Sequence, residues 1–187
     1  MGGPGWWLWV FTTPQETLYR VERGRGSAVV EETLGETFSG MLVSDCLSSY
    51  DPPPYRKHKC VAHHLRAIAK AEKMPGMKDL EYLRQWKVFF RALRVLYDNR
   101  KELPAERFAA MREHLAWECD ALLARPVGQS GDLAVRNRLV KQRPHLLGCL
   151  WEAAAEPTNN RAERALRPAV IARKISCGNK TDRGRHT

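Results

Sequence analysis

The middle of the chain carries two apolar stripes at helical spacing, and this periodicity constrains the fold more than any other feature. The first stripe lies within residues 80–97 and the second between Pro104 and Pro126. Residues that recur every three or four positions form one face of a helix, and an apolar face must be buried against another element. We predict an antiparallel helix pair, then a third helical segment over residues 133–151 that Pro144 interrupts. The stripe positions, which we interpret as core, are Leu80, Leu83, Trp86, Phe90, Leu93 and Tyr97, then Phe108, Met111, Leu115, Cys119 and Leu122.

The beginning of the chain has strand patterns instead. Residues 6–13 are rich in aromatic and β-branched types, a turn follows at Pro14, and residues 17–21 continue the pattern, which predicts a β-hairpin. Its three tryptophans could stack on nucleic-acid bases, but an aromatic-rich strand more often packs in a core, and we favour the core. Ser27 and Gly35 are suitable first and last residues of a short helix.

Two further segments combine strand patterns with chemically active side chains. Residues 40–45 predict a short buried strand that ends at Asp45. Ligands bind at this end of strands in α/β sheets, although an aspartate there can also be a turn residue. Residues 57–66 predict a strand that turns into a helix. Cys60 and His63 have the spacing of zinc ligands, but no second pair follows, so packing or a contact near an active site is the better interpretation.

The stretch over residues 157–168 (PTNNRAERALRP) places one carboxylate among three arginines just after a helix-start signal. We predict a helix from about Arg161 that Pro168 stops or kinks. Its arginines recur at every third position and share roughly one face, with Glu163 just off that face. These arginines are Arg161, Arg164 and Arg167.

Two roles for Glu163 stay open on the local pattern. It could form a capping box with Asn160 and an ion pair with Arg167, one turn later. It could also be a metal ligand held beside arginines that bind nucleic-acid phosphates.

The overall charge points to a polyanionic partner. The chain has 31 Lys and Arg against 21 Asp and Glu, a net charge of +10 and a pI of about 9.7, so nucleic acid is the first candidate and an anionic membrane surface the second. The longest apolar run, residues 6–11, is far shorter than the ~20 residues of a membrane span. We find no secretion signal and expect a cytoplasmic protein with reduced thiols at its five scattered cysteines. The tail over residues 173–185 is basic and is a further candidate for phosphate contact.

Together these motifs resemble the catalytic region of bacterial insertion-sequence transposases of family 66, which belong to the Asp-Asp-Glu superfamily. The resemblance implies an α/β fold with a ribonuclease-H-like mixed sheet, interrupted by a mostly α-helical insertion. It implies one part of the catalytic core over residues 1–75, the insertion over residues 76–150 and the rest of the core over residues 151–187. The likeness is carried by residues 5–10, 42–45, 60–63 and 158–168, with Arg173 and Lys174.

The same resemblance assigns the site. Asp45 matches the second catalytic aspartate and Glu163 the catalytic glutamate, and both are expected to hold Mg²⁺ or Mn²⁺ in a two-metal site. Such a site cuts the element's end and joins the freed 3′ hydroxyl to target DNA. The resemblance also implies a homo-oligomer and no membrane partner. Residues of the family signature near the site are Cys60, His63, Asn159 and Asn160. Residues expected to contact transposon-end and target DNA are Arg161, Arg164, Arg167, Arg173 and Lys174.

The sequence also departs from the family pattern. The family carries its first aspartate on a strand before the Trp-rich strand, whereas only residues 1–5 precede Trp6 here, and Glu16 lies on the wrong side of that strand. We therefore expect a fragment without its first strand that is weak or inactive alone, so whether the chain is an enzyme by itself stays open. The alternatives are a non-catalytic DNA-binding transposase remnant and a helical interaction module over residues 80–150.

Overall fold

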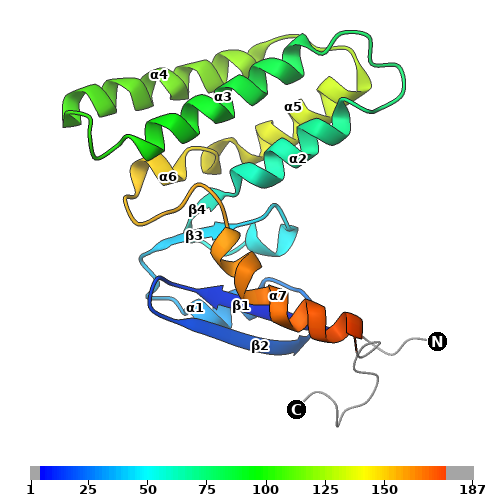
Figure 1. The fold of residues 1–187 in the computed structure, drawn as a ribbon, viewed down its shortest axis with the longest axis vertical. Coiled ribbons are helices and arrows are strands. Elements are labelled where there is room, and N and C mark those ends of the chain that lie inside the picture. The colour runs from blue at the N-terminus through cyan, green and yellow to red at the C-terminus, as the bar shows by residue number, and fades with distance from the viewer. Residues whose placement is uncertain (1–4, 176–187) are drawn as a thin grey trace.

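The computed structural model describes residues 5–175, the last three by their backbone alone. Helices form one end of the molecule, and two small sheets with α1 and α7 form the other (Figure 1). The elements in chain order are β1 (Trp6–Thr12), β2 (Thr17–Arg23), α1 (Ala28–Leu34), β3 (Met41–Ser44), η1 (Ser48–Tyr50), β4 (Arg56–Lys59), α2 (Val61–Ala71), α3 (Glu81–Asp98), α4 (Ala105–Ala124), α5 (Ser130–Gln142), η2 (Arg143–His145), α6 (Gly148–Trp151) and α7 (Asn160–Ile175). The mixed α/β character predicted from the sequence is confirmed.

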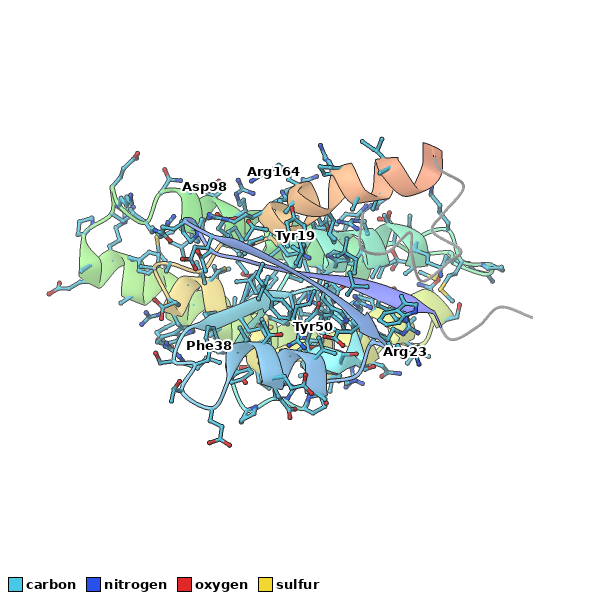
Figure 2. The ribbon with its side chains drawn as sticks, turned by 90° about the horizontal axis from the view of Figure 1, so that it is seen from below. Tyr19, Arg23, Phe38, Tyr50, Asp98 and Arg164 are labelled. Carbon is cyan, nitrogen blue, oxygen red and sulfur yellow. The ribbon has the colours of Figure 1, made fainter. Side chains whose placement is uncertain are left out.

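The predicted hairpin is present as an antiparallel pair of β1 and β2. Its turn is closed by the Thr13 backbone N–H, which donates to the Glu16 carbonyl oxygen at 2.9 Å. On one face, Arg20 contacts α1 through a 2.7 Å hydrogen bond to Thr33. On the other face, the Tyr19 hydroxyl donates to the Ala165 carbonyl oxygen of α7 at 3.0 Å. The hairpin is therefore held between α1 and α7 (Figure 2).

The tryptophans of β1 divide into two kinds. Trp9 is buried, as we predicted for all three, and packs edge-on against Tyr50. The prediction is wrong for Trp6 and Trp7, which are 41% and 44% exposed. The guanidinium groups of Arg23 and Arg25 lie 5.0 and 4.9 Å from the centres of these two rings. Such cation–π contacts contribute about 0.5–1 kcal/mol each at exposed sites. These two rings are therefore contacted by arginine side chains and not buried in the core.

The second sheet pairs β3 in parallel with β4. It confirms both strands that the sequence predicts, although β3 is only partly buried. The described strands form two separate two-stranded sheets, with β1 beside β2 and β3 beside β4. A single ribonuclease-H-like sheet therefore stays a prediction at this point.

The helical end of the molecule is organised around α3. Its stripe is buried as predicted: Leu83, Trp86 and Leu93 are inaccessible to solvent. The helices α2, α4 and α5 all pack against α3, and α3 and α4 lie side by side (Figure 1). Every buried residue of α4 falls in its second half, and Met111 is 41% exposed, so the predicted second stripe is wrong at that position.

Three further expectations can be compared with the described residues. The helix α7 does not stop at Pro168 but continues through it to Ile175. Proline removes one N–H from the helix ladder, and here the site is exposed, so water can satisfy the carbonyl left without a donor.

Within residues 5–175, no helix is long and apolar enough to cross a membrane. The cysteines described are free thiols, while Cys177 lies outside the described residues.

Two buried histidines link the sheets to the helical end. His58 of β4 and His64 of α2 are 0% and 1% exposed. His64 stacks on Phe90 with ring centres 5.5 Å apart. Burial lowers the pKa of His58 to about 4 and that of His64 to about 3. Both side chains are therefore neutral in the folded protein at physiological pH.

We expect these histidines to make the fold sensitive to acid. Between their ordinary pKa of 6.5 and their folded values, the unfolded chain binds protons and the folded chain does not. Stability is therefore complete above pH 6.5 and falls as the pH decreases, by about 2 kcal/mol per histidine at about pH 5. Urea unfolding at about pH 7 and 5 measures this loss.

His64→Phe should reduce the loss between the two pH values by about 2 kcal/mol, the share of this histidine, because it no longer titrates. Phe90→Leu is the matched control, since it weakens the same stack without removing a titratable group. It should lower stability at both pH values and leave the difference unchanged. An equal acid loss in wild type and His64→Phe would contradict the prediction.

Candidate active site

A groove of about 950 Å³ lies between the hairpin and the β3–β4 sheet. It is bordered by β1 and β3, with α7 along one side and residues of α1 and η1 along the other. The groove brings together Asp45, His63 and Glu163, which come from three elements far apart in the sequence. Its lining is otherwise mainly apolar.

Asp45 directly follows β3, where the sequence predicts it. Its Oδ1 atom accepts the Leu47 backbone N–H at 2.9 Å, which is an Asx turn. Oδ2 makes no hydrogen bond within residues 5–175. Asp45 is thus a turn residue and also a lining residue of the groove, so the two interpretations left open by the sequence are compatible.

Glu163 lies in the first turn of α7, beside two side chains of α2. Its Oε1 atom accepts a hydrogen bond from Arg66 at 3.2 Å and lies 3.7 Å from His63 Nε2. Its own N–H donates to the Asn159 carbonyl oxygen, so Asn159 occupies the position before the helix. The described residues show neither the capping box with Asn160 nor the ion pair with Arg167. The capping interpretation is therefore wrong, and Glu163 is a lining residue of the groove.

His63 stands between the two acids. Burial lowers its pKa and Arg66 lowers it further, while the charges of Asp45 and Glu163 raise it less. The ring is therefore neutral at physiological pH and can accept or donate a proton at the groove. Its sequence partner Cys60 is fully buried instead.

The loop before α7 is fixed by one carbonyl group. The oxygen of Pro157 accepts the Val61 backbone N–H at 3.0 Å and lies 3.2 Å from His58 Nε2. Because a carbonyl oxygen can only accept, His58 must carry its proton on Nε2. This contact joins the start of α7 to the junction of β4 and α2, and so brings Glu163 beside His63.

Sequence reasoning missed the roles of Arg66 and His58. Arg66 follows His63 by three positions in a predicted helix, so the two share a face, and this spacing could have indicated a common partner. No local pattern marks His58, because its partner is 99 residues away.

The arginines of α7 differ in their exposure and in their ion pairs. Arg161 forms an ion pair with Glu156 and is one-third exposed. Arg164 and Arg167 are exposed, and Figure 2 shows Arg164 beside α7 at the surface. The side chains of Arg173 and Lys174 lie outside the described residues. Two of the five predicted DNA contacts are thus available on the surface described.

The side chains described do not form a complete metal centre. Within residues 5–175, no group of three or more His, Cys, Asp and Glu residues could hold a metal ion. The predicted two-metal site is therefore not shown, although both expected acids line the same groove.

A strand-end aspartate and a helix-borne glutamate in one groove, with exposed arginines nearby, are typical of proteins that act on nucleic-acid phosphates. The comparison with protein families agrees. The family model described as Transposase IS66 family matches residues 3–187. The chain therefore belongs to this family of insertion-sequence transposases, which supports a role in transposition and implies DNA binding. Neither the curated proteins nor the solved structures compared give a significant match.

We expect Arg164 and Arg167 to contribute to DNA affinity through phosphate contacts. Each Arg→Ala change should make the slope of log affinity against log salt less steep by about one unit, because each contact releases about one counterion. Fluorescence anisotropy of labelled duplex DNA over about 50–200 mM salt measures the slope.

Arg94→Ala is the matched control. Arg94 is an exposed arginine of α3 that is paired with Asp98, at the helical end of the molecule. Its removal should leave the slope unchanged. Identical slopes for all three variants and the wild type would place the α7 arginines outside the DNA interface.

Proposed function

We propose that this chain is the catalytic region of an insertion-sequence transposase, which performs metal-dependent cleavage and strand transfer of DNA. In this proposal Asp45 and Glu163 are its catalytic, metal-binding carboxylates. The proposal is carried by one observation, that Asp45, His63 and Glu163 line a single groove.

The groove offers a donor set that suits Mg²⁺ or Mn²⁺ bound together with DNA. Mg²⁺ usually takes one or two carboxylates and completes its shell with water and substrate oxygens. Asp45 Oδ2 and the Glu163 carboxylate would supply the protein ligands. When bound, such a metal activates water and neutralises charge on the phosphate. A two-metal site would need further ligands from DNA or from chain outside the described residues.

The neighbouring side chains would position these carboxylates. Arg66 holds Glu163 through the contact at 3.2 Å and donates a second hydrogen bond to His63 Nε2 at 3.3 Å. Because its ring is neutral, His63 Nε2 could receive a proton from an attacking hydroxyl. Arg164 and Arg167 would hold the DNA backbone beside the groove.

We also infer that the two small sheets are parts of one ribonuclease-H-like sheet. The groove supports this inference, since β1 of one sheet and β3 of the other both border it. In this description the helical region over residues 76–150 is the insertion between core parts at residues 1–75 and 151–187. A chain of this kind would bind DNA and metal.

Mn²⁺ binding to the full chain, followed by electron paramagnetic resonance, tests the site. Asp45→Asn and Glu163→Gln should each weaken binding about tenfold or more, since even the loss of an indirect ligand partner costs 10–100-fold. Glu156→Gln is the matched control, because Glu156 also lines the groove but pairs with Arg161. If neither Asp45→Asn nor Glu163→Gln changes the affinity, the two acids do not share a metal site.

Arg66 should compete with the metal for Glu163. Arg66→Leu should therefore strengthen Mn²⁺ binding by up to about fivefold, which corresponds to the 1 kcal/mol or less of an exposed ion pair. Lys70→Leu removes one positive charge from the exposed face of the same helix and serves as the control. An equal increase in both variants would indicate a general charge effect and not the release of Glu163.

A further inference from the structure

We infer that a pocket at the helical end of the molecule binds a nucleotide of single-stranded DNA, with the base on Trp151 and the phosphate beside Arg100, Lys101 and Arg112. The pocket has a volume of about 340 Å³ and is separate from the groove described above. This inference deepens the proposed function by naming a form of DNA held near the groove. It rests on that function only for the identity of the nucleic acid.

The pocket is positively charged. It lies where the turn after α3, the first half of α4 and the end of α6 meet. Its charged lining residues are Arg100, Lys101 and Arg112, and no Asp or Glu lines it among the described residues. Lys101 is exposed and forms no ion pair within residues 5–175. A pocket lined by charges of one sign attracts ions of the opposite sign, so an anion such as phosphate is the ligand it favours.

Arg112 is positioned by an aromatic ring and not by a strong ion pair. Its guanidinium lies 3.5 Å from the centre of the Trp151 ring. Its acidic partner in the described chain is the neighbouring Glu113, at 3.4 Å, whose side chain is 61% exposed. The Arg112 Nε atom is buried and has no hydrogen-bond partner there. A buried donor without a partner is costly, so this side chain favours an acceptor that enters the pocket.

Trp151 supplies an aromatic surface to the same pocket. The other three residues of α6 are buried, whereas Trp151 is 55% exposed. Proteins that bind single strands stack bases on aromatic side chains of this kind and follow the backbone with cations. Phe108 of α4 adds an apolar wall to the pocket. The pocket thus combines the two kinds of contact that a nucleotide needs.

The pocket and the groove share one segment of chain, residues 151–156. Trp151 and Ala153 line the pocket. Glu152 and Ala154, which alternate with them, line the groove. The segment follows α6, which contacts both α3 and β4 (Figure 1). A DNA strand that leaves the groove therefore reaches the pocket by crossing this segment.

These features favour an unpaired nucleotide over a duplex. Bases within a duplex stack on one another and present only their edges in the grooves, so they do not lie flat on a tryptophan ring. An unstacked base can do so. A free nucleotide has the same chemistry as one unit of a strand, but the segment shared with the groove favours the strand.

Fluorescence anisotropy of a labelled oligothymidylate of about eight nucleotides, added to the full chain without metal, tests the pocket. Trp151→Ala should weaken binding about tenfold, because stacking of a base on the ring is lost. Trp151→Phe keeps an aromatic ring and should restore most of the affinity. The matched control is Trp117→Ala, which removes a tryptophan of α4 that is 67% exposed and does not line the pocket. It should leave the affinity unchanged.

Lys101→Ala provides a second arm, since this exposed side chain can be removed without disturbing the core. It should make the slope of log affinity against log salt less steep by about 0.7 units, the value for one phosphate contact on a single strand. Lys73→Ala is its control, because Lys73 is an exposed lysine after α2 that lines neither the pocket nor the groove. Circular dichroism verifies the fold of each variant, and Lys101→Ala keeps the test valid if Trp151→Ala unfolds.

Three results would overturn the inference. The first is an unchanged affinity in Trp151→Ala together with an unchanged slope in Lys101→Ala. The second is an equal loss of affinity for labelled duplex DNA in Trp151→Ala, which would show that no unpaired base is recognised. The third is competition by thymidine monophosphate that equals competition by the oligonucleotide, which would assign the pocket to a free nucleotide. Because the assay contains no metal and keeps both acids of the groove, its failure leaves the Mn²⁺ test unaffected.

Discussion

The carbonyl oxygen of Pro157 makes the contact on which the rest of the candidate site depends. It receives the backbone N–H of Val61 and lies within hydrogen-bonding distance of His58. Both donors come from the junction of β4 and α2, which also presents His63 and Arg66. Without this contact, Glu163 would have no fixed position relative to Asp45, because the whole helical region separates them in the chain. The buried histidine fixes this loop, and burial keeps its ring neutral in the folded protein.

The two acids of the candidate site are positioned by weak contacts of different kinds. Asp45 is fixed locally, since its own turn accepts a hydrogen bond two residues later. Glu163 is fixed by an ion pair with Arg66, which is itself exposed, and lies beside the neutral ring of His63. Exposed pairs of this kind contribute little to stability, so the carboxylate can change partners at small cost. In the function proposed above, this small cost would let Glu163 exchange Arg66 for a metal ion.

The hairpin, the strand before Asp45 and the helices of the middle region could be predicted from sequence because each depends on local spacing or on turn residues. The start of the last helix was predicted within one residue for the same reason. Other features depend on distant contacts. The exposure of Trp6 and Trp7, the pairing of Arg66 with Glu163 and the division into two sheets could not be read from any local pattern. The residues expected in the site were named from a family resemblance, and the structure brings Asp45, His63 and Glu163 to one groove, while Cys60 is fully buried.

The segment over residues 61–157, which contains the helical region, begins and ends at almost the same point, since the Val61 nitrogen and the Pro157 oxygen are 3.0 Å apart. A segment whose ends meet in this way is connected to its host as an inserted domain is, by two adjacent chain crossings. Its length can change during evolution without moving the residues on either side, provided that the two crossings stay together. The same geometry permits this region to be exchanged for another module of similar end spacing, so that the groove keeps its shape while the surface around it diversifies.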